Sequence, residues 1–291
     1  MPTLANPPAT IPLDRLAFST NAFKQTNLAG ALSDIAEIGY AGVELMADMP
    51  HFAPARMSDA ELKRVARAAE DMDLKVSNIN GFTGFWAGDT YHPTWISNDP
   101  ADRDTRIKHT LRCIELAHFC KCKTVSLQPG GPTIGTGLSR DAALTRFADG
   151  LHEVLPTAAR RGVTLAIEPE PGLLIESAAE YTRFKKRFFP NENLVRMNCD
   201  LGHLFCVGED PAETIRALPA EIAHVHLEDI AATRVHQHLA PGDGALDFPA
   251  IFAALAEVGY TGWVTAELYP FENDATRVAQ KCYDVLKPML G

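Results

Sequence analysis

Four strand-like segments in the second half of the chain each end in a side chain that can bind a metal or move a proton. The residues at these ends are Glu168, Asp200, His226 and Glu267. Three carboxylates held close together would repel one another and raise one another's pKa values. A divalent cation relieves that repulsion, and three oxygens with one nitrogen suit Mn²⁺, with Mg²⁺ or Co²⁺ as alternatives, better than a thiolate-type zinc site. The pattern predicts a metal centre with these four ligands.

Each of the four residues also has an ordinary structural explanation. Glu168 could simply terminate a strand, Asp200 could cap a turn, His226 could be a hydrogen-bonded core histidine, and Glu267 could be exposed to solvent. All four explanations would have to hold on successive strands, so the metal centre is favoured. Because side chains alternate along a strand, His224 should lie one layer deeper than His226, as a core or supporting residue.

The elements that position these residues alternate between strand and helix. Strand patterns cover residues 16–20, 43–45, 75–80, 124–128, 163–167, 194–200, 223–227 and 262–268. Helix patterns cover residues 28–38, 58–72, 102–119, 139–161, 177–187, 211–218, 249–258 and 276–290. Such alternation without hairpins predicts a parallel sheet, and eight units in this length predict a closed (β/α)8 TIM barrel. We expect a flexible lead-in over residues 1–12 and a single barrel domain over residues 13–291.

Composition narrows the partners and the compartment. The formal charge of −10 argues against nucleic acid and against an anionic membrane surface. The first residues show no signal-peptide pattern, and no apolar run reaches the ~20 residues of a membrane span. The six cysteines are scattered without a CxxC pair, which is typical of free thiols in a reducing compartment. These features predict a cytoplasmic protein.

Several motifs resemble those of the xylose isomerase-like TIM-barrel superfamily. They are Ile167-Glu168-Pro169, Cys199-Asp200-Leu201-Gly202-His203, the segment from His224 to Asp229, the segment from Pro241 to Phe248, and Thr265-Ala266-Glu267-Leu268. More narrowly, the motifs resemble those of the sugar phosphate isomerase/epimerase branch, which includes ketose 3-epimerases, hydroxypyruvate isomerases and inosose dehydratases. It extends over nearly the whole chain beyond Ile11.

The resemblance implies roles for individual residues. Glu168, Asp200, His226 and Glu267 would bind one divalent metal, commonly Mn²⁺, and Glu168 and Glu267 would also act as the catalytic acid/base pair. His203 would contact the substrate. His238 stands where the tagatose-type epimerases have Arg, a departure that argues against a ketohexose substrate. Members of the family often form dimers or tetramers, so a homodimer or homotetramer is expected.

These features predict a metal-dependent isomerase or epimerase that acts on a ketose or keto-polyol. Glu168 would remove the proton next to the carbonyl, giving a metal-stabilised enediolate, and Glu267 would return a proton. Loss of a β-hydroxyl from the same species would make the protein a dehydratase of an inosose, a 3-dehydroshikimate or a 3-oxo-glycoside. A non-catalytic sugar-binding barrel that keeps the metal is a third alternative. The strand ends show neither the second metal site nor the catalytic lysine that an aldose isomerase needs. The early strands also lack the histidines that an endonuclease of this superfamily uses.

Further residues are expected around the substrate. Asn80 and Gln128 end strands and could hydrogen-bond to sugar hydroxyls. Trp86 lies in a long aromatic loop after residues 75–80 that could form either a lid that excludes water or a small hydrophobic cluster. Glu170 and His236 could also line the pocket, but they are not among the residues predicted to bind the substrate.

Overall fold

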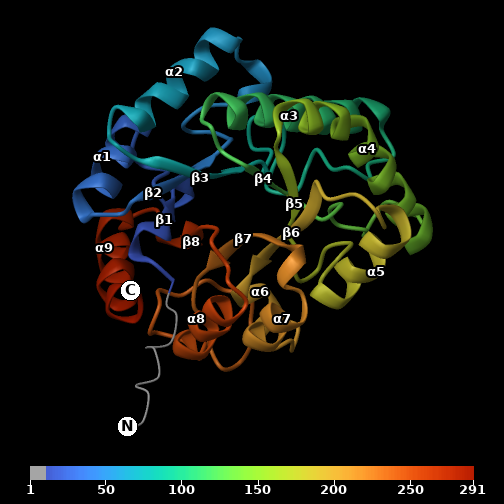
Figure 1. Cartoon of the computed structure of the whole chain (residues 1–291). Coiled ribbons are helices and arrows are strands. Elements are labelled where there is room, and N and C mark those ends of the chain that lie inside the picture. Colours follow the sequence, from blue (N-terminus) through green and yellow to red (C-terminus); the bar gives the residue numbers. More distant parts are fainter. Residues whose placement is uncertain (1–10) are drawn as a thin grey trace.

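Eight parallel strands close into a barrel in which each strand pairs with its neighbours in sequence and β8 pairs with β1 (Figure 1). The structure is a computed structural model that describes residues 11–291. The strands are β1 Leu16–Ser19, β2 Gly42–Met46, β3 Lys75–Asn80, β4 Thr124–Leu127, β5 Thr164–Ile167, β6 Val195–Asp200, β7 Ile222–Leu227 and β8 Val264–Ala266. The predicted (β/α)8 TIM barrel is confirmed.

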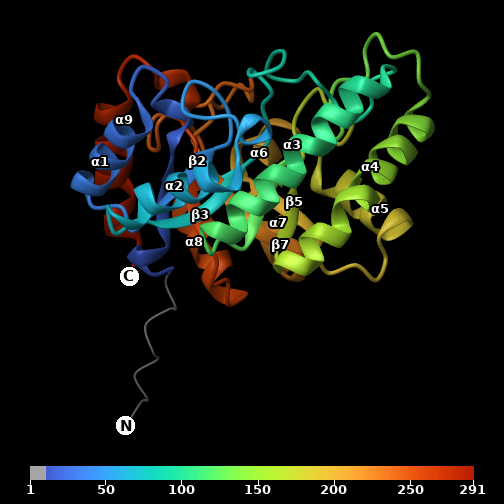
Figure 2. The ribbon, with the colours of Figure 1, turned by 90° about the horizontal axis from the view of Figure 1, so that it is seen from above.

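Helices follow each strand and surround the barrel. They are α1 Leu28–Ile38, α2 Asp59–Glu70, α3 Pro100–Phe119, α4 Arg140–Arg161, α5 Ala178–Phe188, α6 Leu201–Cys206, α7 Pro211–Ala217, α8 Phe248–Glu257 and α9 Ala275–Leu286. Short 3₁₀ helices cover Leu13–Arg15, Thr20–Ala22, Pro54–Arg56, Pro219–Glu221, Tyr269–Phe271 and Lys287–Met289. The view in Figure 2 shows α3 and α4 lying side by side along the outside of the barrel. Among the described residues, none of the helices combines the length and the apolar character needed to cross a membrane.

Local sequence signals explain where many helices begin and end. The side chain of Ser58 accepts a hydrogen bond from Glu61 N, and Glu61 Oε2 accepts one from Ser58 N at 2.7 Å, so the predicted capping box at α2 is confirmed. Gly39 ends α1 in the left-handed region, with φ of 106°, where a residue without Cβ is least strained.

Several elements differ from the predicted ones. Strand β1 ends at Ser19 because a 3₁₀ helix begins at Thr20. The last strand covers only Val264–Ala266, because its pairing with β1 and with β7 is limited to these residues. Helix α6 was not predicted, because it starts directly after β6 without a loop, with Asp200 accepting a hydrogen bond from His203 N as its N-cap.

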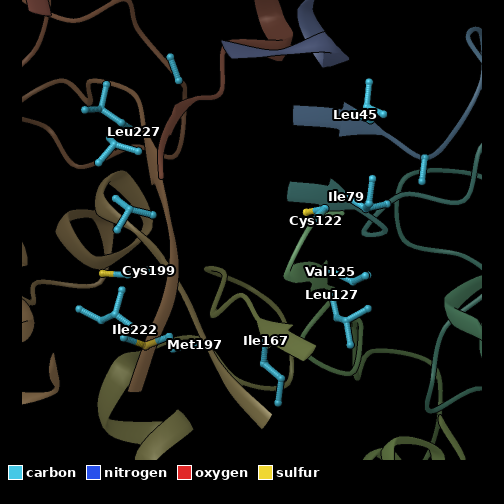
Figure 3. Close-up of a cluster of buried hydrophobic side chains, with 14 of the residues drawn as sticks. Leu45, Ile79, Cys122, Val125, Leu127, Ile167, Met197, Cys199, Ile222 and Leu227 are labelled. Carbon is cyan, nitrogen blue, oxygen red and sulfur yellow. The ribbon is translucent and has the colours of Figure 1, made fainter. Parts of the chain in front are cut away.

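Apolar side chains on the strands pack beneath the helices, and polar ones fill the barrel. Figure 3 shows part of the apolar set, which includes Leu45, Ile79, Val125, Ile167 and Leu227. Inside the barrel, Ser77 Oγ lies 3.1 Å from Thr265 Oγ1, which joins β3 to β8. Such cross-barrel contacts between hydrogen-bonded polar groups fix side chains in single positions.

The two ends of the described chain meet at the amino-terminal side of the barrel. Leu13 N donates to Gly291 O at 2.9 Å, and Gly291 N donates to Ile11 O at 3.1 Å. Most of the predicted lead-in, residues 1–10, lies outside the described residues, whereas Ile11 is buried. The domain boundary at residue 12 stays a prediction.

Candidate metal centre and substrate cavity

The four predicted ligands lie together at the carboxyl ends of their strands. Glu168, Asp200, His226 and Glu267 each offer one ligand atom, and these atoms lie within 4.8 Å of one another. Glu168 and Glu267 follow β5 and β8 by one residue and remain in register, because Glu168 N donates to Leu127 O and Glu267 N donates to Leu227 O. All four side chains are buried.

His226 lies at the centre of the cluster. Its Nδ1 is 2.9 Å from Glu168 Oε1, 3.7 Å from Glu267 Oε1 and 3.9 Å from Asp200 Oδ2. Burial alone would lower the pKa of His226, but the surrounding carboxylates raise it well above its usual value. Burial raises the pKa of Glu168 and that of Glu267, so both carboxyls are held in an environment that penalises their negative charge.

Unused oxygen lone pairs show that a cation fits this cluster. Glu168 Oε2 and Asp200 Oδ2 are buried and lack a hydrogen-bond partner among the described residues. Buried carboxylate oxygens are costly to leave without a partner, and a divalent cation would satisfy both. The donor set of three carboxylates and one imidazole is the one expected for a hard or borderline divalent ion.

Glu44 on β2 is a fifth residue of the centre, and its position in the sequence did not predict this. Glu44 Oε2 accepts from His226 Nε2 at 2.6 Å across the barrel, and His224 Nε2 lies 3.6 Å from the same oxygen. Asn78 and Asn80 also donate to Glu44, at 2.8 and 3.1 Å. Burial opposes ionisation of Glu44, but the charge and hydrogen bond of His226 outweigh it and lower its pKa to about 2.

This contact determines which nitrogen of His226 can bind a cation. With Nε2–H donating to Glu44, the lone pair of the neutral ring is on Nδ1, and Nδ1 faces Glu168, Asp200 and Glu267. A carboxylate behind a metal-binding histidine is a common arrangement that fixes the tautomer and the ring orientation. His224 lies one layer deeper, as its spacing predicted, and is buried against Glu44.

A cavity of about 310 Å³ opens directly onto the cluster. Glu168 and Glu267 line it, together with the predicted substrate residues Asn80 and His203. Its volume is within the usual range for a small-molecule site, about 300–1,000 Å³. Glu170 and His236, for which a place in the pocket was left open, line it as well.

The aromatic loop between β3 and α3 forms one wall of the cavity. Phe82, Phe85 and Tyr91 line the cavity, whereas Trp95 is buried and packs edge-on against Phe147 with ring centroids 5.7 Å apart. Part of the loop therefore lines the cavity, and part belongs to the main hydrophobic core. Its role as a lid that excludes water stays a prediction.

Two buried charged residues hold this loop in place. Asp48 accepts from Thr83 Oγ1, Phe85 N and Trp86 N at 2.6–3.0 Å. From the other side, the buried guanidinium of Arg106 donates to the carbonyl oxygens of Gly81, Phe82 and Pro93 at 2.8–3.1 Å. Hydrogen bonds to charged groups are among the stronger ones in proteins, so the cavity wall is firmly anchored.

Three of the predicted substrate contacts do not reach the cavity wall. Gln128 is fully buried beneath the loop, because its Nε2 donates to Tyr91 O at 2.9 Å. Trp86 stacks on His109 with ring centroids 5.7 Å apart. His238 is buried behind the wall, where its Nδ1 donates to Glu267 O at 2.8 Å. These three residues support the site rather than line it.

The closed parallel barrel defines the class of the protein as a (β/α)8 barrel. Its cavity, which is lined by acidic residues and histidines, lies at the carboxyl ends of the strands, where the active sites of barrel enzymes lie. The family described as xylose isomerase-like TIM barrel matches residues 32–288, and the chain belongs to that family. The predicted resemblance is confirmed.

Two of the proteins that are similar in sequence are inosose dehydratases. An inosose dehydratase from Clostridium botulinum (strain Alaska E43 / Type E3) is 24% identical over 270 residues, which cover 84% of this chain and 83% of that protein. An inosose dehydratase from Geobacillus kaustophilus (strain HTA426) is 31% identical over 143 residues, which cover 44% of this chain and 46% of that protein.

Solved structures with the same fold include two sugar epimerase relatives and a zinc-binding protein. A 3-keto-D-glucoside 4-epimerase from E. coli aligns with a TM-score of 0.76 and 20% identity, covering 94% of this chain and 99% of that one. A D-tagatose 3-epimerase-like protein aligns with a TM-score of 0.79 and 20% identity, covering 94% and 96%. The IOLI protein with a bound zinc atom aligns with a TM-score of 0.74 and 19% identity, covering 95% and 99%. At these identities the likeness establishes the fold alone.

Proposed function

We propose that the protein is a metal-dependent enzyme that removes the α-proton of a ketose or keto-polyol. The observation that carries the proposal is that Glu168 and Glu267 line the cavity and also belong to the ligand cluster with Asp200 and His226. Two carboxylates at one small cavity can remove a proton and return it, provided that the resulting negative charge is stabilised.

The four-residue cluster would hold the cation that stabilises this charge. A divalent ion there would polarise the substrate carbonyl and lower the cost of the negative charge that develops on its oxygen. We propose Mn²⁺ because carboxylate oxygens with one imidazole suit it, with Mg²⁺ or Co²⁺ as alternatives.

The chain's own residues would carry out the proton transfers. Glu168 would take the α-proton, and Glu267 would return a proton to the opposite face or to the neighbouring carbon. Asn21 Nδ2 and Asn80 Nδ2 donate to Glu267 Oε1 at 2.9 and 3.0 Å, which orients this carboxyl group. Asn80 and His203 line the cavity and keep their proposed role as contacts to the substrate.

The charge of the cavity wall favours an unphosphorylated substrate. Lys24 lines the wall, but its Nζ is engaged with Glu272 Oε2 at 3.4 Å. Among the described residues that line the cavity there is no other lysine and no arginine to pair with a phosphate group. We therefore propose a neutral carbohydrate as the substrate.

The first proton transfer leaves two outcomes open, and different relatives support each. Return of the proton gives an isomerase or epimerase. This is the activity named for the similar 3-keto-D-glucoside 4-epimerase, and a second similar structure is described as D-tagatose 3-epimerase-like. Loss of a β-hydroxyl gives a dehydratase, and this second candidate is supported by the inosose dehydratase that is similar to most of the chain. Incubation with candidate ketoses and inososes in D₂O separates them: deuterium at the α-carbon without loss of water indicates an epimerase or isomerase, and loss of water indicates a dehydratase.

Two conservative substitutions test the acid/base assignment. Glu168→Gln and Glu267→Gln keep the size of each side chain and remove the group that moves the proton, so turnover should fall by at least about 100-fold. Glu153→Gln, at an exposed position on α4, is the matched control and should keep full activity. Activity within a few-fold of the control in either site variant would contradict the assignment. Absence of α-proton exchange with every candidate substrate would instead favour the sugar-binding alternative.

The metal, the oligomeric state and the compartment need separate measurements. Elemental analysis should find a divalent ion that is lost in Asp200→Ala, and mass measurement in solution tests the proposed homodimer or homotetramer. The cytoplasmic location is also a proposal. It is supported by the six cysteines, which all lie in the described part of the chain and carry free thiols.

A further inference from the structure

The side-chain amide of Asn21 is only partly used within the protein. Asn21 is 5% exposed and lines the cavity, and its Nδ2 donates to Glu267 Oε1 at 2.9 Å. Its carbonyl oxygen, Oδ1, is buried and has no hydrogen-bond partner among residues 11–291. In that part of the chain, the second hydrogen of Nδ2 has no acceptor either. The amide therefore keeps one donor and one acceptor for a group that enters the cavity.

The backbone around Asn21 is fixed without help from the Asn21 side chain. Asn21 belongs to the 3₁₀ helix Thr20–Ala22, which follows β1 directly. Ser19 Oγ accepts from Asn21 N at 3.3 Å, and Thr20 Oγ1 accepts from Met46 N at 2.9 Å, which joins this helix to β2. Because β1 pairs with β8, the helix lies beside the carboxyl end of β8. The Asn21 side chain can therefore be replaced without removing any of these backbone bonds.

Other polar side chains of the cavity wall have used their donors within the protein. Asn80 Nδ2 donates to two carboxylates, at 3.1 and 3.0 Å, so Asn80 can offer a substrate only an acceptor. The hydroxyls of Thr83 and Tyr91 also donate to carboxylates, at 2.6 and 3.1 Å. A polyol that approaches this wall therefore meets many acceptors, and the second N–H of the Asn21 amide is a free donor beside them.

We propose that Asn21 binds a hydroxyl group of the substrate through the free donor and acceptor of its amide. The inference rests on the proposed function, because it takes Glu267 as the group that returns the proton. Since Asn21 Nδ2 is 2.9 Å from Glu267 Oε1, the hydroxyl lies on the carbon that receives this proton or on the next one. The competing explanation is that the amide only orients Glu267.

Such a contact would make the cavity selective for a hydroxyl at one position of the substrate. An analogue that lacks this hydroxyl would leave the buried oxygen of Asn21 without a donor. Sites built to bind a hydroxyl reject analogues without it for this reason. Loss of the hydroxyl should therefore weaken binding by about 10- to 100-fold. An amide that only orients Glu267 would give no such preference.

The test compares an inosose with deoxyinososes that each lack one hydroxyl α or β to the carbonyl. Dissociation constants are measured by calorimetry on metal-loaded full-length protein that carries Glu168→Gln, so that the ligands do not react. Adding Asn21→Ala should weaken binding of the inosose by about 10- to 100-fold. Binding of one deoxyinosose, the one that lacks the hydroxyl bound by Asn21, should change by less than about threefold. The other deoxyinososes keep this hydroxyl and should lose as much affinity as the inosose.

A second variant and a control accompany this comparison. Asn21→Ser removes the amide but keeps a small polar group, and it should show the same selective loss as Asn21→Ala. Asn191→Ala, at an exposed position after α5, is the matched control and should bind every ligand like the parent protein. Circular dichroism shows whether each variant is folded.

Two results would overturn the proposal. One is the same change in affinity, or none, for every ligand in the folded Asn21 variants, which is expected if the amide only orients Glu267. The other is failure of the parent protein to bind any member of the series, which would also contradict a keto-polyol as the substrate. If the selective loss is found but protein with Glu168 intact exchanges no α-proton in D₂O, the proposed reaction fails and the role of Asn21 stands.

Discussion

Replacing Glu44 tests whether this residue prepares His226 to bind a metal. Glu44 Oε2 accepts from His226 Nε2 at 2.6 Å, and both residues are fully buried. In Glu44→Gln the amide oxygen can still accept this hydrogen bond, but the negative charge is lost, so Mn²⁺ affinity should fall about tenfold, or ~1.4 kcal/mol. In Glu44→Ala no acceptor remains, and the loss should be about 100-fold, or ~2.7 kcal/mol.

The same substitution should also lower the stability of the metal-free protein. In the wild type, Asn80 Nδ2 donates to Glu44 Oε1 at 3.1 Å. In Glu44→Gln, the amide oxygen would turn towards His226, so the amide N–H₂ group would face the donor of Asn80. A buried donor without an acceptor costs about 1–3 kcal/mol, which urea denaturation of the stripped protein can measure.

The assay is calorimetric titration of metal-stripped protein with Mn²⁺. Glu153→Gln is the control and should bind like the wild type, because its side chain is exposed on α4. The reasoning about Glu44 would be refuted if Glu44→Ala, shown to be folded by circular dichroism, bound Mn²⁺ within twofold of the wild type.

Three further predictions concern the metal centre of Glu168, Asp200, His226 and Glu267 and its surroundings. Burial alone would lower the pKa of His226, but nearby carboxylates raise it, so a bound ion must displace a proton from this ring. Apparent Mn²⁺ affinity should therefore rise up to about tenfold per pH unit through neutral pH. A pH-independent affinity in calorimetry would contradict this. Arg106→Met removes the donor to three loop carbonyls and should lower the free energy of unfolding in urea by ~2–4 kcal/mol. The control Arg183→Met, at an exposed position, should change it by less than about 0.5 kcal/mol. Similar urea midpoints for the two variants would count against the anchoring role of Arg106. In Gly202→Ala the added Cβ would lie 1.7 Å from Glu228 Oε1, so the free energy of unfolding should fall by ~1–3 kcal/mol. Adding Glu228→Ala should partly restore it. A wild-type melting temperature in the single variant would refute the clash.

The sequence was sufficient to predict the barrel and the convergence of four residues. Parallel strands of a closed barrel all end at one face, so residues of the same parity at successive strand ends must meet there. Glu168, Asp200, His226 and Glu267 could be found this way without knowledge of any register between strands.

Glu44 could not be found in the same way, because its role depends on contacts across the barrel. Strand β2 is otherwise apolar, and Glu44 lies two residues before its end rather than at it. Its pairing opposite Asn78 also follows a register shift at Val43, which residue patterns do not encode. Spacing alone cannot place a side chain in the interior opposite His226.

Loop residues were the other source of error. His236 reaches the cavity through the path of the loop after β7, which has no periodic pattern to read. Gln128 was predicted from its strand-end position to face the substrate, but the loop after β3 folds over it and occupies its amide. Side chains at strand ends are predictable only where no loop covers them.

The hydrogen bonds that join residues 11–13 to Gly291 also bear on whether the chain could be circularly permuted. Because the two ends of the described chain touch on the side away from the cavity, a short linker could connect them, and new termini could be opened elsewhere by circular permutation. The loop that carries Ile134, whose side chain is 93% exposed, is a suitable opening point. A permuted gene cut there would place β5 to β8 first, so the half that carries all four ligands would leave the ribosome before the half that carries Glu44.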